Sequence, residues 1–258
     1  FLVLYFGISL TPWIGSISHD IETCFNETIT IAFFISIALT FFLPVLQFSF
    51  VHSRKSVDLY FALPIKRENQ LITNILFSFL VCFGYFLLTV LFTYIFMAHL
   101  QIHFAKIAAL LGFTALSMLE LLIIHAAIYL LANNVFDGIV MLGAYSCIPL
   151  LVYITSISFF YQMVAGITTA SFDFSMFMHL SPVAMVTRNF QTCFITDRAM
   201  KGSYFIVPIL FTAVSGYIAW KNFVERQTER AEQLSDQFLA YPFIIHIYAF
   251  LILMVFAA

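Results

Sequence analysis

The chain has 258 residues, of which 62% are hydrophobic and only 9% are charged. Soluble globular domains have roughly 45–50% apolar and about 25% charged residues, so this composition excludes a soluble globular protein and predicts a membrane protein. The formal net charge of −2 also excludes a broad polycationic surface, and we expect no nucleic-acid partner.

Seven apolar runs are long enough to cross the ~30 Å hydrocarbon core of a bilayer. They are continuously apolar rather than alternating, which favours helices over barrel strands. We therefore expect an all-α, polytopic membrane protein with about six to seven transmembrane helices. Because both ends of the chain lie inside apolar runs, we also expect a fragment that is truncated at both ends. In chain order, the runs cover residues 1–18, 29–50, 71–98, 107–132, 138–161, 204–220 and 238–258.

The connecting loops predict an orientation, because basic loops are retained on the cytoplasmic side. If the first run enters from the cytoplasm, a basic loop at residues 51–70 and a connector at residues 221–237 lie inside. The longest expected non-spanning stretch, residues 162–203, then lies outside, and its semi-apolar sequence favours helices at or dipping into the outer interface. Seven basic residues lie inside in this topology: Arg54, Lys55, Lys66, Arg67, Lys221, Arg226 and Arg230. Four lie outside: Lys106, Arg188, Arg198 and Lys201.

The loop at residues 51–70, with the sequence VHSRKSVDLYFALPIKRENQ, has the pattern of a short amphipathic helix over residues 57–63. We expect Ser56 to cap this helix, Asp58 to lie in its first turn and Pro64 to stop it. From spacing alone, the plain interpretation is a topology determinant whose cations lie near lipid phosphates. Three apolar side chains share one helical face by three- and four-residue spacing: Val57, Tyr60 and Phe61.

This loop resembles the first cytoplasmic loop of type-2 ATP-binding-cassette (ABC) exporter permeases, especially the Gram-positive peptide- and antibiotic-related branch. Members of that branch carry a basic pair, then Val-Asp, an aromatic residue, and Leu-Pro followed by basic residues. The segment FVERQTERAEQLSDQF is similar to the connector before a seventh span in the longer permeases of the branch, whereas the minimal unit has six spans. The matching loop residues are Arg54, Lys55, Val57, Asp58, Tyr60, Leu63, Pro64, Lys66 and Arg67.

The resemblance implies that residues 1–258 form a single transmembrane permease domain in a bacterial plasma membrane. Its loop would contain a coupling helix, with Phe61 on its apolar face, that docks on a separate nucleotide-binding subunit. ATP and Mg would bind that subunit, and a second copy or a related permease would complete the transporter. Residues 162–203 would form outer re-entrant helices. The expected cargo is hydrophobic or amphipathic, such as a peptide, an antibiotic or a lipid-like molecule.

The motifs that are missing from the sequence bear on the alternatives. The chain has no GxxxxGK[ST] phosphate loop, so ATP, if used, binds another polypeptide and this chain holds no cofactor. It also has no HExxH or GxSxG motif, so we expect no enzymatic activity of its own. A secondary transporter or channel that uses an intramembrane carboxylate stays open as an alternative, and a membrane-embedded enzyme with an unfamiliar site is a weaker one.

Glu120 is the acidic residue that lies inside an expected span. A charged carboxylate there costs about 2.5–3.5 kcal/mol on insertion scales. Our hypothesis is that Glu120 faces a cargo path or the interface with a second permease; the alternative is a neutral carboxyl that is hydrogen-bonded to a neighbour. His99 and His103 have metal-binding spacing but lack a third ligand nearby, so we expect no metal site.

The cysteines are far apart and form no CxxC or Cys/His metal pattern, so most are expected to act as small apolar residues. Cys24 and Cys193 both fall outside in the expected topology. A bridge between them is an open alternative, whereas bridging is not expected for the membrane-buried Cys82 and Cys147.

Overall fold

The structure is a computed structural model, and it is helical over the residues that it describes, with no strand among them. The prediction of an all-α fold is confirmed for this part of the chain. The described residues are 17–96, 104–163, 181–191, 194, 203–226, 229, 231–233, 235 and 237–257. The elements are α2 (Ile17–Phe48), η1 (Ser49–His52), α3 (Arg54–Phe61), α4 (Arg67–Phe96), α5 (Phe104–Leu130), α6 (Val135–Met163), α8 (Pro182–Phe190), α9 (Ser203–Val224) and α10 (Tyr241–Ala257).

Within the described residues, four helices are long and apolar enough to cross a membrane, which indicates a membrane-embedded protein. They correspond to the second, third, fourth and fifth expected runs. Helices α9 and α10 occupy the sixth and seventh runs, while the first run lies almost wholly outside the described residues. The count of six to seven spans therefore stays a prediction. The four spans cover Thr23–His52, Arg67–Ile95, Ile107–Leu130 and Val135–Phe159.

Helix α2 corrects an expected boundary. The second span was expected to begin at residue 29 after an outer loop, but α2 already begins at Ile17 and has 32 residues. No Gly or Pro lies between Ile17 and Pro44, so nothing breaks the helix earlier. At 1.5 Å per residue it is roughly 48 Å long, which exceeds the ~30 Å apolar core, so its polar first turns extend beyond that core.

The segment expected as an outer loop is therefore helical where the structure describes it. The Thr28 hydroxyl donates to the carbonyl of Cys24 at 2.8 Å, one turn earlier in α2. Cys193 lies outside the described residues, so the expected alternative of a bridge between Cys24 and Cys193 stays untested. Of residues 162–203, the structure describes the nine-residue helix α8, whose interfacial or re-entrant placement stays a prediction.

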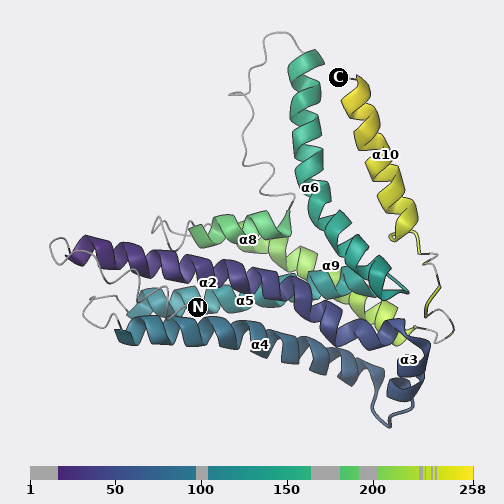
Figure 1. Cartoon of the computed structure of the whole chain (residues 1–258), viewed down its shortest axis with the longest axis horizontal. Coiled ribbons are helices and arrows are strands. Elements are labelled where there is room, and N and C mark those ends of the chain that lie inside the picture. Colours follow the sequence, from purple (N-terminus) through teal and green to yellow (C-terminus); the bar gives the residue numbers. More distant parts are fainter. Residues whose placement is uncertain are drawn as a thin grey trace.

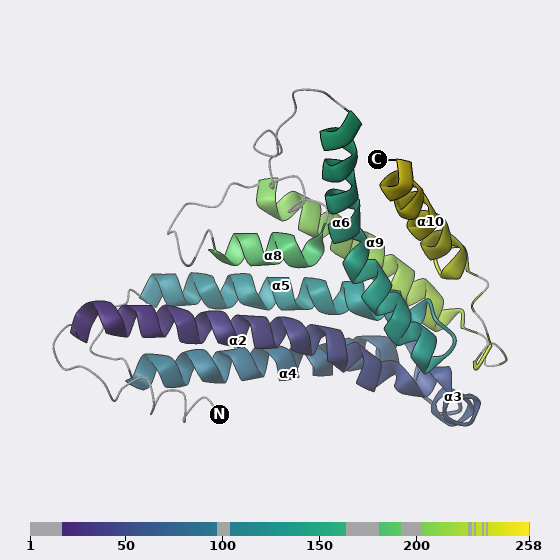
Figure 2. The same cartoon turned by 45° about the horizontal axis from the view of Figure 1, so that its top comes forward.

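Helix α5 occupies the centre of the bundle and contacts α2, α4, α9, α6 and α8 (Figure 1). One core cluster joins α2, α5 and α8, and within it the rings of Phe33 and Phe190 stack with their centroids 3.9 Å apart. A second cluster joins η1, α4, α5 and α9 around Phe48 and Phe223. Helix α6 packs against the bundle near Leu142 and then extends away from it, with α10 at its side (Figures 1 and 2).

The turn between α5 and α6 depends on Gly138. The ring of Tyr129, which is fully buried, lies so close to Gly138 that an added Cβ would come within 2.5 Å of its Cε2 atom. No such contact is tolerated without a shift of the ring or of the backbone. Gly138 therefore permits the close approach of the first turn of α6 to the end of α5.

We predict that Gly138→Ala destabilises the protein by about 1–3 kcal/mol, because the new methyl group overpacks against Tyr129. Gly143→Ala is the matched control, since it lies in the same helix and its added Cβ would meet nothing within 4 Å. Thermal unfolding of the two purified variants in the same detergent measures the difference. An equal melting temperature for the two variants would contradict the packing described for Tyr129.

Candidate functional site

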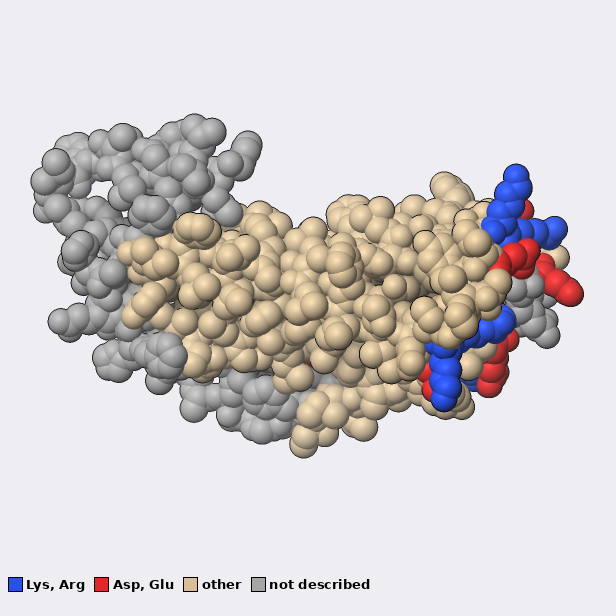
Figure 3. Space-filling model, turned by 90° about the horizontal axis from the view of Figure 1, so that it is seen from below, with Lys and Arg blue, Asp and Glu red and all other residues tan. Residues whose placement is uncertain are grey.

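Charged side chains gather at one end of the molecule, on the right of Figure 3, around α3. We call this region the charged end. It combines the loop after α2, the first residues of α4, the end of α9 and the connector before α10. Its charged residues include Arg54, Lys55, Asp58, Lys66, Arg67, Glu68, Lys221, Glu225, Arg226, Glu229 and Glu232.

Helix α3 lies in the loop for which the sequence predicts a helix, but with different bounds. It begins at Arg54 after Ser53, whose backbone is extended. Ser56 therefore lies inside the first turn and Asp58 lies beyond it, so the expectations that Ser56 caps the helix and that Asp58 lies in its first turn are both wrong. The helix ends at Phe61, and the N–H of Ala62 donates to the carbonyl of Asp58 at 3.1 Å. Pro64 then follows, where the chain cannot continue as a helix.

The apolar face of α3 packs against the protein itself. Val57 is fully buried, and the half-buried ring of Phe61 lies 5.9 Å from the ring of Phe223 in α9. Val57 is therefore not accessible to a partner in this structure, whereas the expected contact of Phe61 with a partner stays a prediction. The bundle offers them an apolar surface within the same chain, and burying them there removes their area from water.

The side of the loop opposite the buried face of α3 is exposed, and we call it the α3 outer surface. It holds three aliphatic side chains, Leu59, Leu63 and Ile65, with exposed fractions of 69%, 43% and 51%. Leu59 and Ile65 were not among the residues singled out from the sequence. Leu59 could have been found, because it lies two residues from Val57 and so on the other helical face. The surface consists of Lys55, Asp58, Leu59, Tyr60, Leu63, Pro64, Ile65 and Lys66, all exposed.

The four cations of the loop divide into two pairs. Lys55 and Lys66 are exposed, whereas both arginines bind backbone carbonyls of distant segments. Arg67 donates through Nη1 to the carbonyls of Val224 and Arg226, at 2.9 Å each, and its guanidinium carbon lies 4.0 Å above the ring of Phe61. These carbonyls lie at the end of α9, where the backbone has no further helical N–H groups to donate to them.

Arg54 binds the connector at a second point. Its Nε donates to the carbonyl of Ala231 at 3.1 Å, and its backbone N–H donates to the carboxylate of Glu232 at 3.2 Å. The Arg54 and Glu232 side chains also form an exposed ion pair at 3.9 Å, which adds little by itself. The connector is therefore held by the first residue of α3 and by the first residue of α4.

The connector in turn caps the end of α5. The buried Arg226 donates through both Nη atoms to the carbonyl of Ala132 at 3.0 Å, and through Nη1 to that of Leu130 at 3.3 Å. The hydroxyl of Ser235 donates to the carbonyl of Leu131 at 2.7 Å. From the sequence, Arg226 was expected only as a basic residue on the cytoplasmic side. Its hydrogen bonds to the carbonyls at the end of α5 are not indicated by the sequence alone.

Glu120 lies away from the charged end, ten residues before the end of α5, or ~15 Å along the helix axis. It is 5% exposed, and it lies one turn before Ile123, whose side chain faces Gly216 of α9. His125 does not face it but bonds through Nδ1 to the carbonyl of Thr40 in α2 at 3.0 Å. The hypothesis that Glu120 faces a cargo path or a permease interface stays a prediction.

No group of three or more His, Cys, Asp or Glu side chains that could hold a metal ion occurs within the part of the chain that the structure describes. His99 and His103 lie outside that part.

Comparison of the chain with protein-family models, with curated proteins and with solved structures gives no match. A function must therefore be argued from the residues and the geometry of the chain itself.

We predict that Arg67→Gln lowers the free energy of unfolding by about 1.5–3 kcal/mol, because it removes charge-assisted hydrogen bonds to two carbonyls. Lys66→Gln removes the same charge from the neighbouring exposed position and is expected to stay near wild type. Melting temperatures of the purified variants measure the effect. If both substitutions shift the melting temperature equally, the bonds from Arg67 to the end of α9 do not stabilise the fold.

Proposed function

We propose that the chain is the transmembrane permease subunit of an ATP-binding-cassette exporter in a bacterial plasma membrane. It moves a hydrophobic or amphipathic cargo, such as a peptide, an antibiotic or a lipid-like molecule. ATP and Mg bind a separate nucleotide-binding subunit, and a second permease copy or a related permease completes the assembly. The observation that carries the proposal is a short helix at the charged end with its apolar face buried in the bundle and a second, aliphatic surface exposed.

The composition of the α3 outer surface supports a protein partner. Exposed aliphatic side chains that are flanked by charges are typical of docking surfaces, where an apolar centre is surrounded by a polar rim. Here the centre consists of Leu59, Leu63 and Ile65, and the rim includes Asp58 and Lys55. An anchor on the lipid surface would depend on the cations and would tolerate the loss of Asp58.

The contacts behind α3 support a mechanical role for it. Phe61 lies against Phe223 of α9, and Arg67 at the start of α4 bonds to the end of α9. A push on α3 from a closing ATP-binding subunit would therefore act on α4 and α9 together. Rigid packing of this kind transmits displacement between elements rather than absorbing it.

The orientation follows from the basic residues in the sequence. In the proposed topology the charged end is cytoplasmic, with Arg54, Lys55, Lys66 and Arg67 retained on that side. An ATP-binding subunit in the cytoplasm would meet α3 there. The resemblance of the loop to the permease family supports the same placement.

A secondary transporter or channel is the second candidate, and buried Glu120 is the observation that favours it. Ionisable residues within membrane spans often mark the paths of ions or substrates. In an exporter, the same carboxyl would line the cargo path or the contact with a second permease.

Truncation of the α3 outer surface tests the docking proposal. We expect Leu59→Ala and Asp58→Ala each to weaken co-elution with the ATP-binding subunit encoded beside the gene by about fivefold or more, as for central interface residues. Leu80→Ala, at an exposed leucine in the middle of α4, is the matched control and should bind as wild type. Wild-type co-elution and ATP hydrolysis in both α3 variants would rule out docking through this surface.

Glu120→Gln tests the role of the buried carboxyl. The amide has nearly the same shape, so we expect assembly with the ATP-binding subunit to be preserved and cargo export into vesicles to fall. ATP hydrolysis without cargo is the readout for intact assembly. Unchanged export would show that the carboxyl of Glu120 does not act on the cargo path.

A further inference from the structure

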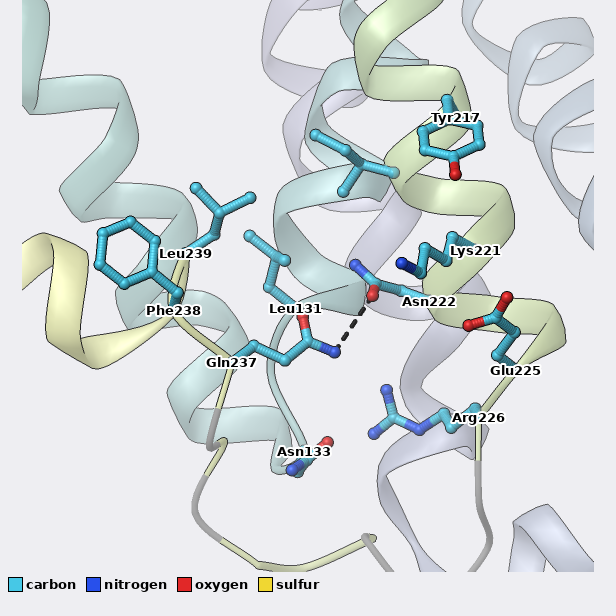
Figure 4. Close-up of a pocket in the computed structure, with 11 residues that line it drawn as sticks. Leu131, Asn133, Tyr217, Lys221, Asn222, Glu225, Arg226, Gln237, Phe238 and Leu239 are labelled. Carbon is cyan, nitrogen blue, oxygen red and sulfur yellow. Dashed lines mark hydrogen bonds between the residues drawn. The ribbon is translucent and has the colours of Figure 1, made fainter.

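A cavity of about 720 Å³ opens at the charged end, on the side of α9 that faces α6 and α10 (Figure 4). Its walls come from the last turns of α9, from the turn between α5 and α6, and from the connector residues just before α10. No α3 residue lines it. The cavity is therefore separate from the α3 outer surface, and binding of a ligand in it does not depend on the exporter proposal.

The polar side of the cavity carries a positive charge that points inward. Figure 4 shows the amine of Lys221 directed into the cavity, and the carboxylate of Glu225 also belongs to the lining. Arg226 adds a second cation to the lining, although it donates to the carbonyls of Leu130 and Ala132. The lining thus carries more positive than negative charge, so an anion at Lys221 would meet a net attraction.

A hydrogen bond fixes the shape of the cavity. The amide nitrogen of Gln237 donates to Oδ1 of Asn222 at 3.1 Å, which joins the connector to α9 (Figure 4). Above this bond the lining is apolar, with Leu131 on the bundle side and Leu239 on the connector side (Figure 4). Ile218 of α9 adds to this apolar lining. The cavity is therefore amphipathic, with a polar region beside an apolar one.

Two aromatic side chains indicate the depth of the cavity in the membrane. The rings of Tyr217 and Trp220 stack with their centroids 6.2 Å apart, and both side chains are exposed on α9. Tyr and Trp are enriched at the level of lipid headgroups, where one end of the ring is apolar and the other is hydrated. Because Tyr217 also lines the cavity, this pair of rings favours a position of the cavity at the level of the headgroups.

We propose that this cavity binds one anionic phospholipid from the leaflet at the charged end. The phosphate lies against the ammonium of Lys221 and accepts a hydrogen bond from the hydroxyl of Tyr217, which points toward Lys221 in Figure 4. An acyl chain runs along Ile218 and Leu239 toward the bilayer. Pockets for small ligands have volumes of about 300–1,000 Å³, so the cavity can hold a headgroup with its glycerol.

The net charge of the lining selects the class of lipid. Lys221 and Arg226 contribute two positive charges and Glu225 one negative charge, which leaves a net charge of +1. Basic pockets beside membrane helices favour anionic headgroups, and each Lys or Arg near an anionic lipid contributes about 1 kcal/mol. A zwitterionic phosphatidylcholine gains no such net attraction.

Native mass spectrometry of the purified full chain tests the proposal. Wild type is exposed to equal amounts of phosphatidylglycerol and phosphatidylcholine with matched acyl chains, and we expect it to retain phosphatidylglycerol preferentially. Lys221→Gln should retain about fivefold less phosphatidylglycerol, since 1 kcal/mol corresponds to that factor. Lys106→Gln, at the opposite end of α5, removes the same charge and should retain as much as wild type.

Three outcomes would overturn the proposal. The first is equal retention of the two lipids by wild type, and the second is undiminished retention of phosphatidylglycerol by Lys221→Gln. The third is displacement of the lipid by millimolar inorganic phosphate, which would assign the cavity to a free anion. Lys221→Arg is the control for a folding defect. Because it keeps the positive charge, we expect it to retain as much phosphatidylglycerol as wild type. A loss of retention in this variant would contradict a site that depends on charge.

Discussion

The fold at the charged end depends on how the last carbonyls of α5 and α9 are satisfied. A helix leaves its final four carbonyls without intrahelical partners, and here both helices end side by side at the charged end. Arg226 donates to the carbonyls at the end of α5, and Arg67 donates to those at the end of α9. Arginine suits this role because its planar group carries five donors, stays charged and complements the helix dipole.

These bonds connect segments that are far apart in the sequence. Arg67 starts α4 and contacts the ring of Phe61 at the end of α3, so the same side chain joins three helices. An eight-residue helix is marginal in water by itself, and α3 is stabilised by burying Val57 and Phe61 against the bundle. The result is a short helix held by its inner face, with its outer surface exposed.

Hydrophobic runs predicted most of the helices, because spanning a bilayer requires continuous apolar sequence with internal backbone bonds. The long helix α2 was missed at its start, since its polar first turns resemble a loop in composition although no Gly or Pro breaks them. The spacing of Val57 and Phe61 predicted an apolar face but not whether that face would meet the bundle or a partner. The roles of Arg67 and Arg226 depend on carbonyls more than 90 residues away, which no local pattern reveals.

The central claim is that the α3 outer surface docks on an ATP-binding subunit, and crosslinking in cells tests it most directly. A photo-crosslinking amino acid is placed at position 59, where the native leucine is 69% exposed, and at position 46, an exposed leucine of α2, as the control. The account predicts that position 59 crosslinks to a polypeptide with a phosphate-binding loop, identified by mass spectrometry, and that position 46 does not. Crosslinks from position 59 to lipid alone would contradict it.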